Sequence, residues 1–405
     1  MERRTMYSFL RRNLELAGVL DGETGFVGPE LLQIDLTNNC NNNCIACWCR
    51  SPLLQEQVIS PELGAQTLPL ELVKKTLDDC ARMGTVDIYL AGGGEPFMHP
   101  DIMEILAYIK KLGFRCHLNT NFTLVDRERA ATLNHLGVDN LIVSLWAATP
   151  ASYVASHSNQ TEATFERITD TITHLANLKK GGPPHIKLYN VIMSKNYHEV
   201  VEMAEFAHRI GADAVEYTPA DIIPGYTDEL LLNEDQRRQV LDCETRLQEL
   251  DEEYGGRPDL WYREFMRRLS GTGASMGEYD QLMLTDIPCN IGWNFSRILA
   301  DGNVNACLKA HRIPVGNIHE ESFRSIWNGR LQKEFRQKTR TADVTDPFFT
   351  MIGNDEGTQV SQIGCHRGCD DIDRNRRLQK RLEKLSLAQR LILKGVGRLY
   401  RMFRT

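Results

Sequence analysis

The sequence predicts an α/β fold of six strand–helix repeats, followed by a small cysteine-bearing domain and a basic terminal helix. Strand-like apolar runs alternate with helix-like stretches from residue 31 to residue 253. This alternation implies a parallel sheet flanked by helices, either open or curved into a partial barrel. A second group of cysteines begins at Cys289, and the chain is strongly basic from Arg374 onwards.

Six apolar runs predict the strands of this sheet. They cover Leu31–Leu36, Val86–Leu90, Arg115–Leu118, Asn140–Leu145, His185–Ile192 and Ala214–Tyr217. Helices are predicted between and after them, and several begin at a capping residue or Pro and end near Gly. They cover Leu70–Arg82, Asp101–Leu112, Asp126–Leu136, Glu162–Leu178, Tyr197–Ile210 and Asn233–Glu253.

The same pattern predicts five segments along the chain. We expect an N-terminal helical extension in residues 1–29, the barrel in 30–254, a linker in 255–286, the cysteine-bearing domain in 287–372 and a basic amphipathic helix in 373–405. A chain of 405 residues is long enough for two domains with sizeable cores.

The composition excludes several classes of protein. Hydrophobic residues make up 42% and charged residues 25%, as in ordinary globular proteins. No apolar run reaches the ~18–20 residues that a membrane span needs, and Met1 to Arg12 lack the apolar core of a secretory signal. Eleven cysteines without an export signal favour metal ligation in a reducing compartment, so we expect a cytoplasmic location.

The charge is distributed unevenly. From Arg374 to the end the chain carries eleven Lys or Arg and one acid, Glu383, a net charge of +10. The overall charge of −7 therefore leaves −17 on residues 1–373. Such an acidic body disfavours a nucleic-acid partner.

Two motifs follow the first two predicted strands. Cys40, Cys44 and Cys47 follow the first strand, and Gly92-Gly93-Gly94-Glu95-Pro96 follows the second. The carboxyl ends of parallel strands form the active-site edge of such sheets, so the two motifs converge on one rim.

The spacing C-x3-C-x2-C predicts an iron–sulfur cluster with one open iron. Three thiolates can hold three irons of a [4Fe–4S] cluster, whereas electron carriers use four cysteines. The fourth iron then has room for a substrate or cofactor, as in catalytic zinc sites. The alternatives are a zinc site or a complete cluster with Cys49 as the fourth ligand.

Together, the cysteines and Gly93-Gly94-Glu95-Pro96 resemble the radical S-adenosylmethionine (SAM) superfamily over about residues 30–220. The resemblance implies a partial (β/α)6 TIM-like barrel in which SAM chelates the open iron. The reduced cluster then cleaves SAM to a 5′-deoxyadenosyl radical, which abstracts a hydrogen atom from the substrate. The glycines at 92–94 would let the backbone approach the methionine moiety. Backbone carbonyls of this loop and Glu95 would accept hydrogen bonds from the SAM ammonium, and Pro96 would stiffen the turn.

Further SAM contacts are implied at the ends of the later strands. The resemblance carries over to Thr120, Asn121, Ser144, Asn190 and Tyr217 as neighbours of the ribose, carboxylate or adenine. The alternative is that they are simply satisfied polar residues at strand ends.

Two positions depart from the family pattern. An aromatic residue usually precedes the third cysteine and packs near adenine, but this chain has Ala46 there and Trp48 after the cysteine. The fourth strand often ends in Ser-x-Asp, whereas Ser144 is followed by Leu145 and Trp146. These departures concern the packing of the cofactor rather than the cluster.

The second cysteine group resembles a SPASM or twitch domain. Cys289 and Cys307 flank an Asp301-Gly302 turn between apolar runs, which predicts a hairpin. Full SPASM domains hold two auxiliary clusters and need about seven cysteines. The resemblance therefore implies the shorter twitch form, with one auxiliary [4Fe–4S] cluster on Cys289, Cys307, Cys365 and Cys369. A zinc ribbon is the alternative.

The basic tail predicts an amphipathic helix. Leu378, Leu382, Leu385, Ile392, Val396, Leu399 and Phe403 follow three- and four-residue steps or their multiples, with Lys and Arg around them. We expect this helix to dock on its own acidic domain. Peripheral contact with a membrane surface is the second interpretation.

The substrate is less constrained than the radical generator. About 30 residues precede the first strand, fewer than a leader-peptide recognition module of ~80 residues needs, so we expect a sugar, a lipid-linked intermediate or another small non-peptide molecule. The net reaction would be dehydrogenation, epimerisation or carbon–carbon bond formation, with a flavodoxin or ferredoxin as reductant. A peptide maturase that forms crosslinks or epimers is the first alternative, and a non-catalytic iron–sulfur carrier is the second.

Overall fold

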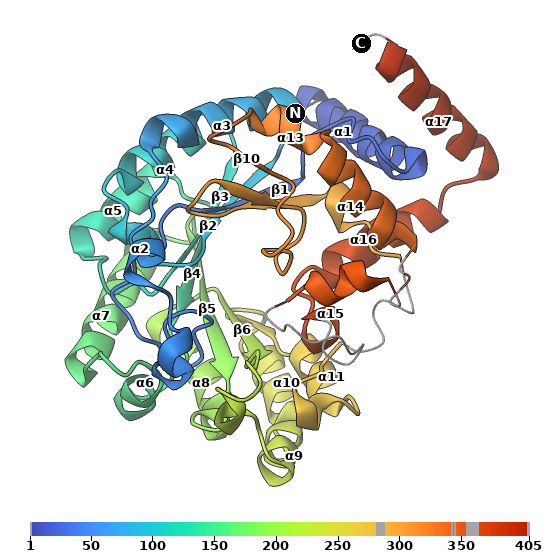
Figure 1. Ribbon diagram of the computed structural model, residues 1–405. Coiled ribbons are helices and arrows are strands. Elements are labelled where there is room, and N and C mark those ends of the chain that lie inside the picture. Colours follow the sequence, from blue (N-terminus) through green and yellow to red (C-terminus); the bar gives the residue numbers. More distant parts are fainter. Residues whose placement is uncertain (1, 281–287, 342, 344–345, 354–363, 403–405) are drawn as a thin grey trace. The chain divides into compact units, whose positions relative to one another are not determined.

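The computed structural model describes residues 2–280, 288–341, 343, 346–353 and 364–402 (Figure 1). The chain divides into two compact units that do not follow its order. The first unit contains residues 1–34, 68–88 and 281–405, and the second contains residues 35–67 and 89–280. Strand β2 (Asp87–Ala91) begins in the first unit and ends in the second.

The first unit contains a four-stranded part of the sheet in the order β10-β9-β8-β1. β1 pairs with β8 in parallel, and β8, β9 and β10 follow as antiparallel neighbours. Gly302 turns between β8 and β9 with φ +86°, which confirms the predicted hairpin. The strands are β1 (Leu31–Asp35), β8 (Phe295–Ile298), β9 (Asn303–Asn305) and β10 (Gly316–Asn317).

Helices from both ends of the chain belong to this first unit. They are α1 (Glu2–Asp21), α3 (Leu70–Met83), α13 (Phe323–Trp327), α14 (Arg330–Thr341), α15 (Gly364–Arg367), α16 (Ile372–Glu383) and α17 (Leu387–Met402). Short 3-10 helices cover Ile291–Trp293 and Pro347–Met351. α13 begins at Ser322, whose side chain accepts a hydrogen bond from the Ser325 backbone N–H and so caps the helix.

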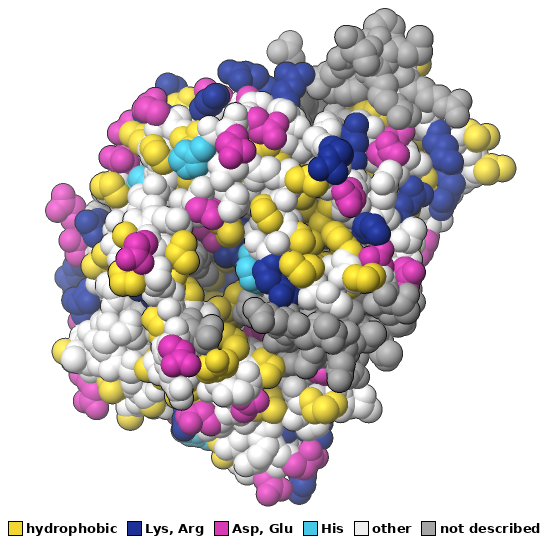
Figure 2. All heavy atoms as spheres, in the orientation of Figure 1, with side chains coloured by type: hydrophobic (Ala, Val, Ile, Leu, Met, Phe, Trp, Pro, Cys, Tyr) yellow, Lys and Arg dark blue, Asp and Glu magenta, His cyan; other side chains and the backbone are white. Residues whose placement is uncertain are grey.

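The basic tail forms two helices, α16 and α17, rather than one. Leu378, Leu382 and Leu393 pack with residues of α1, Leu16 among them, in one buried cluster, as the docking prediction expects. α17 lies beside α1 (Figure 1). Ile392, Val396 and Leu399 of the second helix are exposed instead of sharing the docked face. Figure 2 shows apolar side chains beside basic ones at the end of α17 that follows α16. Phe403 lies outside the described residues.

The second unit contains five parallel strands in the order β3-β4-β5-β6-β7. All six predicted strands are present within two residues of the predicted bounds. The strands of this unit are β3 (Arg115–Thr120), β4 (Asn140–Ser144), β5 (His185–Ile192), β6 (Ala214–Pro219) and β7 (Asp259–Trp261).

Helices alternate with these strands, which confirms the α/β fold with a mostly parallel sheet. They are α2 (Pro61–Gly64), α4 (Ile102–Lys111), α5 (Arg127–Leu136), α6 (Pro150–Ser156), α7 (Glu162–Leu178), α8 (Val200–Ile210), α9 (Glu234–Asp242), α10 (Glu244–Glu253) and α11 (Arg263–Ser270). Side chains of Asp126 and Thr161 cap α5 and α7. Short 3-10 helices cover Pro52–Gln57, Pro96–Met98, Tyr197–Glu199, Asp228–Leu230 and Ala274–Met276.

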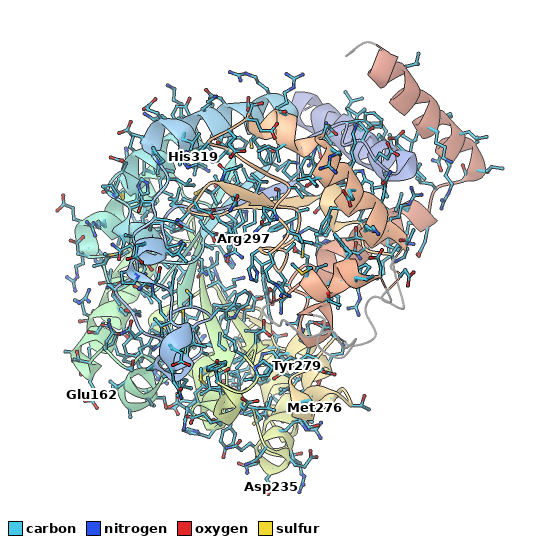
Figure 3. All side chains as sticks on the ribbon, in the orientation of Figure 1. Glu162, Asp235, Met276, Tyr279, Arg297 and His319 are labelled. Carbon is cyan, nitrogen blue, oxygen red and sulfur yellow. The ribbon has the colours of Figure 1, made fainter. Side chains whose placement is uncertain are left out.

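The segment expected to be a linker contains regular structure. β7 pairs in parallel with β6, and α11 buries Phe265 and Met266, so residues 255–280 extend the second unit. Tyr279 closes this extension by donating its hydroxyl to the Ala220 carbonyl at 3.3 Å (Figure 3). The sequence did not reveal these two elements because both are short. β7 follows two glycines, and α11 is rich in Arg. The remainder of the expected linker, 281–286, lies outside the described residues.

Among the described residues, no helix is long and apolar enough to cross a lipid bilayer.

Candidate cofactor and metal sites

The cysteine loop and the glycine loop contact each other within the second unit. The backbone N–H of Glu95 donates to the Asn39 carbonyl at 2.9 Å. Arg50 donates to the Asn38 carbonyl at 2.6 Å and so braces the same stretch of the cysteine loop. The two motifs predicted to converge on one rim therefore do converge.

The glycines are needed for this close contact. A Cβ added at Gly94 would lie 2.1 Å from the Asn39 carbonyl oxygen, and one at Gly93 would lie 2.2 Å from Asn38 Oδ1. Gly92 adopts φ +140°, which side chains disfavour. Close contact with the cysteine loop is therefore one reason for glycine at positions 93 and 94. At position 92 the reasons are the backbone conformation and the contact with Asp35, 2.6 Å from an added Cβ.

Glu95 ties the glycine loop to the end of β3. Its buried carboxylate accepts hydrogen bonds from the Thr120 hydroxyl at 2.6 Å, the Asn121 N–H at 2.7 Å and the Phe97 N–H at 3.1 Å. Burial raises the pKa of Glu95 to about 7, although the hydrogen bonds oppose that rise. A SAM ammonium in the expected contact with Glu95 would therefore bind a carboxylate that already accepts three hydrogen bonds from the protein.

The three cysteines of the first motif lie in a partly buried loop and are close enough for their charges to interact. The Asn42 N–H donates to Cys40 Sγ at 3.4 Å, and the Asn121 amide lies 4.0 Å from the same sulfur. Burial raises the pKa of Cys40 to about 11 and also raises the pKa of Cys44, to which Cys47 and Cys40 contribute by charge repulsion. Metal binding requires the thiolates, so it would release these protons.

Cys49 contacts the third cysteine rather than completing the set. Its sulfur lies 3.8 Å from Cys47 Sγ and 3.5 Å from the Gly93 carbonyl oxygen. Donation from the Cys49 thiol lowers the pKa of Cys47, while the pKa of Cys49 itself is raised by the same contact. Cys49 therefore links the cysteine loop to the glycine loop.

The thiols of Cys40, Cys44 and Cys47 suit an iron–sulfur cluster, and the loop that carries them would adjust its shape when the cluster binds. Within the described part of the chain, no three His, Cys, Asp or Glu side chains are closed into a preformed metal site. Three neighbouring thiols that perturb one another nevertheless match the soft ligands that iron–sulfur clusters require. The same unit contains buried polar atoms without partners among the described atoms: Asn42 Nδ2 in the cysteine loop, and both amide atoms of Asn190 in β5.

The predicted SAM contacts at the strand ends differ in their hydrogen bonding. Thr120 and Asn121 join the glycine and cysteine loops, and Ser144 donates to Asn119 at 3.1 Å on the neighbouring strand. Asn190 is buried, and neither atom of its amide has a hydrogen-bond partner among the described atoms. Tyr217 differs, because its hydroxyl donates to the Val200 carbonyl of α8 at 3.0 Å. It therefore links β6 to α8.

Sequence reasoning missed a cluster of polar side chains around Cys44. His157 forms an isolated β-bridge with Cys44, and the Ser156 carbonyl accepts from the Ile45 N–H. Tyr153 and Trp146 pack on the His157 ring, whose pKa burial lowers to about 4. The only sequence signal was Trp146 in place of the usual Asp.

The second cysteine group lies in the first unit. Cys289 and Cys365 pack against an apolar cluster that includes Phe349 and Ile352. Burial raises the pKa of Cys289 to about 12 and that of Cys365 to about 11. Burial also raises the pKa values of Cys307 and Cys369. Charge repulsion adds to both: Cys365, Asp371 and Cys289 act on Cys307, and Asp371 and the other three thiols act on Cys369. All four predicted auxiliary ligands are therefore neighbours.

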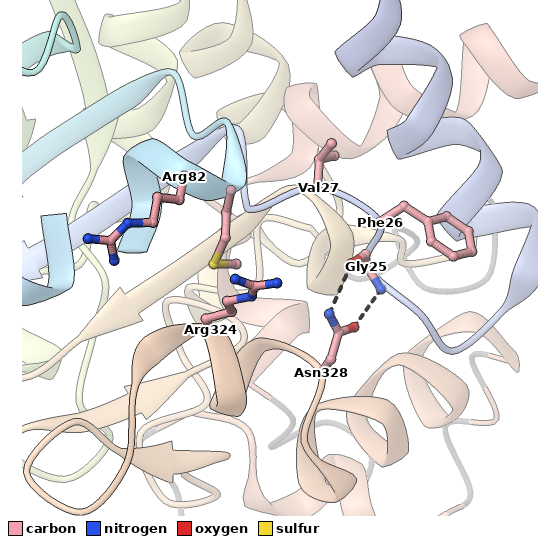
Figure 4. A pocket seen from close by; sticks show the side chains of 7 residues that line it. Gly25, Phe26, Val27, Arg82, Arg324 and Asn328 are labelled. Atoms are coloured by element: carbon pink, nitrogen blue, oxygen red, sulfur yellow. Dashed lines mark hydrogen bonds between the residues drawn. The ribbon is translucent and has the colours of Figure 1, made fainter. Parts of the chain in front are cut away.

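A separate pocket lies in the first unit, between the segment after α1 and α13 (Figure 4). Its wall is built by the Asn328 amide, which donates to the Gly25 carbonyl at 3.0 Å and accepts from the Gly25 N–H at 2.8 Å. Arg82 and Arg324 also line it. None of the predicted site residues lies in this pocket.

Family comparisons match both halves of the chain. The radical SAM superfamily model matches residues 34–207, and the model of the SPASM iron-sulfur cluster-binding domain matches residues 289–346. These ranges contain the first three cysteines, the glycine loop, Cys289 and Cys307.

Curated relatives are similar over part or most of the chain. The AdoMet-dependent heme synthase of Methanosarcina barkeri is 27% identical over 317 residues, covering 76% of this chain and 85% of that protein. The subtilosin biosynthesis protein AlbA of Bacillus subtilis is 28% identical over 317 residues, covering 76% of this chain and 62% of that protein. A cofactor-modifying protein for tungsten-containing aldehyde ferredoxin oxidoreductase, from Pyrococcus furiosus, is 28% identical but matched over only 49% of its length.

Solved structures share the fold. SuiB of Streptococcus suis bound to S-adenosylmethionine aligns with a TM-score of 0.57 at 15% identity, over 76% of this chain and 68% of that one. His-tagged anSMEcpe with bound AdoMet aligns with a TM-score of 0.56 at 15% identity, over 90% of this chain and 98% of that one.

Proposed function

Because this chain belongs to the radical SAM superfamily and carries a C-terminal SPASM domain, we propose that it cleaves SAM reductively and removes a hydrogen atom from a substrate. The observation that supports this most is the contact between the cysteine loop and the glycine loop through Glu95, Asn39 and Cys49. When bound, a reduced [4Fe–4S] cluster supplies the electron that converts SAM to methionine and a 5′-deoxyadenosyl radical.

The chain's own residues hold and orient these groups. The thiolates of Cys40, Cys44 and Cys47 would ligate three irons, leaving the fourth for SAM. The Gly92–Gly94 backbone and the unpaired Asn190 amide would receive the cofactor. Glu95 fixes the loop by its three hydrogen bonds, so the loop geometry is set before the cofactor arrives.

The four remaining cysteines would hold one auxiliary [4Fe–4S] cluster. Cys289, Cys307, Cys365 and Cys369 would close its coordination, which suits electron transfer. Enzymes of this superfamily need an external reductant, here proposed to be a flavodoxin or ferredoxin. The auxiliary cluster would accept an electron from the substrate radical in a net oxidation.

We propose a small non-peptide substrate, such as a sugar or lipid-linked intermediate. Similarity to a heme synthase over most of its length supports this class. A peptide maturase is the second candidate, supported by the similarity to AlbA, a bacteriocin biosynthesis protein, over 76% of this chain. Transfer of deuterium from a labelled substrate into 5′-deoxyadenosine separates the two classes.

Metal analysis after anaerobic reconstitution tests the two-cluster proposal. Two cubane clusters predict about eight irons per chain. The double substitution Cys289→Ala/Cys307→Ala is expected to leave about four. About four irons per chain in the wild type would contradict the proposed auxiliary cluster. A protein that holds zinc and no iron would contradict the proposed enzyme activity and indicate a structural metal site.

We also propose peripheral contact between α17 and an anionic bilayer. α17 carries no acidic residue, and it exposes Leu387, Leu391 and Ile392 at 75%, 62% and 64% beside the cation Lys394. Apolar side chains flanked by cations are typical of helices that lie in the membrane interface.

Vesicle co-sedimentation tests this contact. The full chain is expected to bind phosphatidylglycerol vesicles more than phosphatidylcholine vesicles, and Leu391→Glu/Ile392→Glu to abolish the difference. The control Gln239→Glu/Gln248→Glu adds the same charge on exposed positions of α9 and α10. Equal sedimentation of both double variants would refute the contact.

A further inference from the structure

Trp146 occupies an unusual position directly after β4. Its backbone adopts φ +59°, a left-handed conformation that a bulky aromatic residue rarely takes. The Asn196 amide donates to its carbonyl at 2.8 Å and holds it there. Such strain persists only where the surroundings impose it, and it concentrates at ligand sites.

The Trp146 side chain is buried without a hydrogen-bond partner. It is only 9% exposed, and its indole N–H finds no acceptor among the described atoms. Buried indole N–H groups normally have a partner, so an unpaired one needs an explanation. A bound ligand that supplies an acceptor is one.

His157 presents the complementary atom. Its ring lies 5.3 Å from that of Trp146, and its Nδ1 lies 3.0 Å from the Tyr153 carbonyl oxygen. A carbonyl can only accept, so Nδ1 carries the hydrogen and Nε2 of the neutral ring presents a lone pair. Nε2 is also buried without a partner. One unpaired donor and one unpaired acceptor thus belong to two rings in contact.

Both rings adjoin the cysteine loop. Trp146 belongs to an apolar cluster with Ile45 and Met193, and Cys44 and Ala46 pack against this cluster. Ala46 is the position before the third cysteine, where a methyl group leaves room for a larger neighbour. Trp146 therefore supplies a flat aromatic surface beside position 46, where the side chain is only a methyl group.

We propose that Trp146 and His157 form the adenine-binding part of the SAM site in this chain. The indole would give the base a packing surface, its N–H would donate to a ring nitrogen, and His157 Nε2 would accept from the exocyclic amino group. Adenine is distinguished by an acceptor nitrogen next to an amino donor, the complement of these two atoms. This inference rests on the proposed function, because it requires SAM to bind beside Cys44.

Equilibrium binding of S-adenosylhomocysteine and S-inosylhomocysteine to the anaerobically reconstituted chain tests the proposal. The inosine base replaces the amino donor with an oxo acceptor, which would face the His157 lone pair. The wild type is therefore expected to bind the adenosyl compound more tightly, by about tenfold. His157→Phe is expected to remove this discrimination.

Trp146→Phe keeps an aromatic surface and removes only the N–H. It is expected to weaken binding of the adenosyl compound by about threefold to tenfold, with the cluster absorbance unchanged. Trp261→Phe is the matched control, since Trp261 is 46% exposed and its N–H already donates to Asp259.

These binding measurements distinguish failure of the SAM site from failure of the adenine assignment. Wild-type protein that binds neither compound would overturn the SAM site itself. Wild-type protein that binds both equally, or Trp146→Phe and His157→Phe variants that behave like wild type, would overturn the adenine assignment alone.

Discussion

The sulfur of Cys49 lies 3.8 Å from that of Cys47 and 3.5 Å from the carbonyl oxygen of Gly93. Two sulfurs in direct contact are too close to serve different corners of one cubane cluster. We therefore propose that Cys49 donates a hydrogen bond to the Cys47 thiolate when Cys47 holds an iron, a contact of the kind that tunes iron–sulfur clusters.

Iron content distinguishes a ligand from a neighbour at this position. Cys49→Ala is expected to keep the wild-type iron count after reconstitution, because three ligands remain. Cys47→Ala is expected to lose about four irons. Loss of iron in Cys49→Ala equal to that in Cys47→Ala would make Cys49 a ligand.

The stability of the cofactor-free protein should depend on Glu95 near neutral pH. Burial raises its pKa from 4.5 to about 7, so the folded protein binds this proton more tightly than the unfolded chain. The resulting stabilisation is complete below about pH 4.5 and is lost as the pH rises through about 7. It amounts to roughly 3 kcal/mol at most.

Urea unfolding between pH 5 and pH 8 measures this effect. The wild type is expected to lose stability relative to Glu95→Gln as the pH rises, since the amide cannot ionise. Parallel curves for the two proteins would show that Glu95 has an ordinary pKa.

Contact between the loops should make Gly94 intolerant of a side chain. A Cβ there would overlap the Asn39 carbonyl oxygen at 2.1 Å, so Gly94→Ala is expected to lower the free energy of unfolding by about 1–3 kcal/mol. Gly395→Ala in α17 meets nothing within 4 Å and is expected to raise it by up to about 1 kcal/mol. Urea midpoints compare them, and a neutral Gly94→Ala would mean that the loops separate easily.

The docking of α17 on α1 should contribute to stability through Leu393 but not through the nearby Leu391. Leu393 is 7% exposed within the cluster that joins these helices, whereas Leu391 is 62% exposed. Leu393→Ala is expected to cost about 2 kcal/mol or more and Leu391→Ala less than about 0.5 kcal/mol. Equal costs in thermal unfolding would argue against the docked helix.

The sequence predicted the repeating part of the fold well because periodicity and caps are local signals. The strand from His185 to Ile192 and the helix from Glu162 to Leu178 have the predicted bounds. β7 and α11 were missed because short elements carry too few residues to show a period. Tertiary contact alone decides that β7 pairs with β6.

The contact between the two loops could be predicted because its residues belong to motifs. The convergence of the cysteine and glycine loops follows from strand order, which the sequence reveals. The roles of Tyr217 and Trp146 depend on which way a side chain turns at the end of a strand. Tyr217 bonds to α8, whereas Trp146 turns into the cluster beside the cysteine loop.

Formation of 5′-deoxyadenosine tests the central claim most directly. Anaerobically reconstituted protein is mixed with dithionite and SAM, and the nucleoside is quantified by chromatography. We expect wild type and Cys243→Ala, which alters a thiol bonded within its own helical segment, to form 5′-deoxyadenosine, and Cys44→Ala to form none. An iron-loaded wild type that forms none, or a Cys44→Ala variant that forms as much as wild type, would contradict the account.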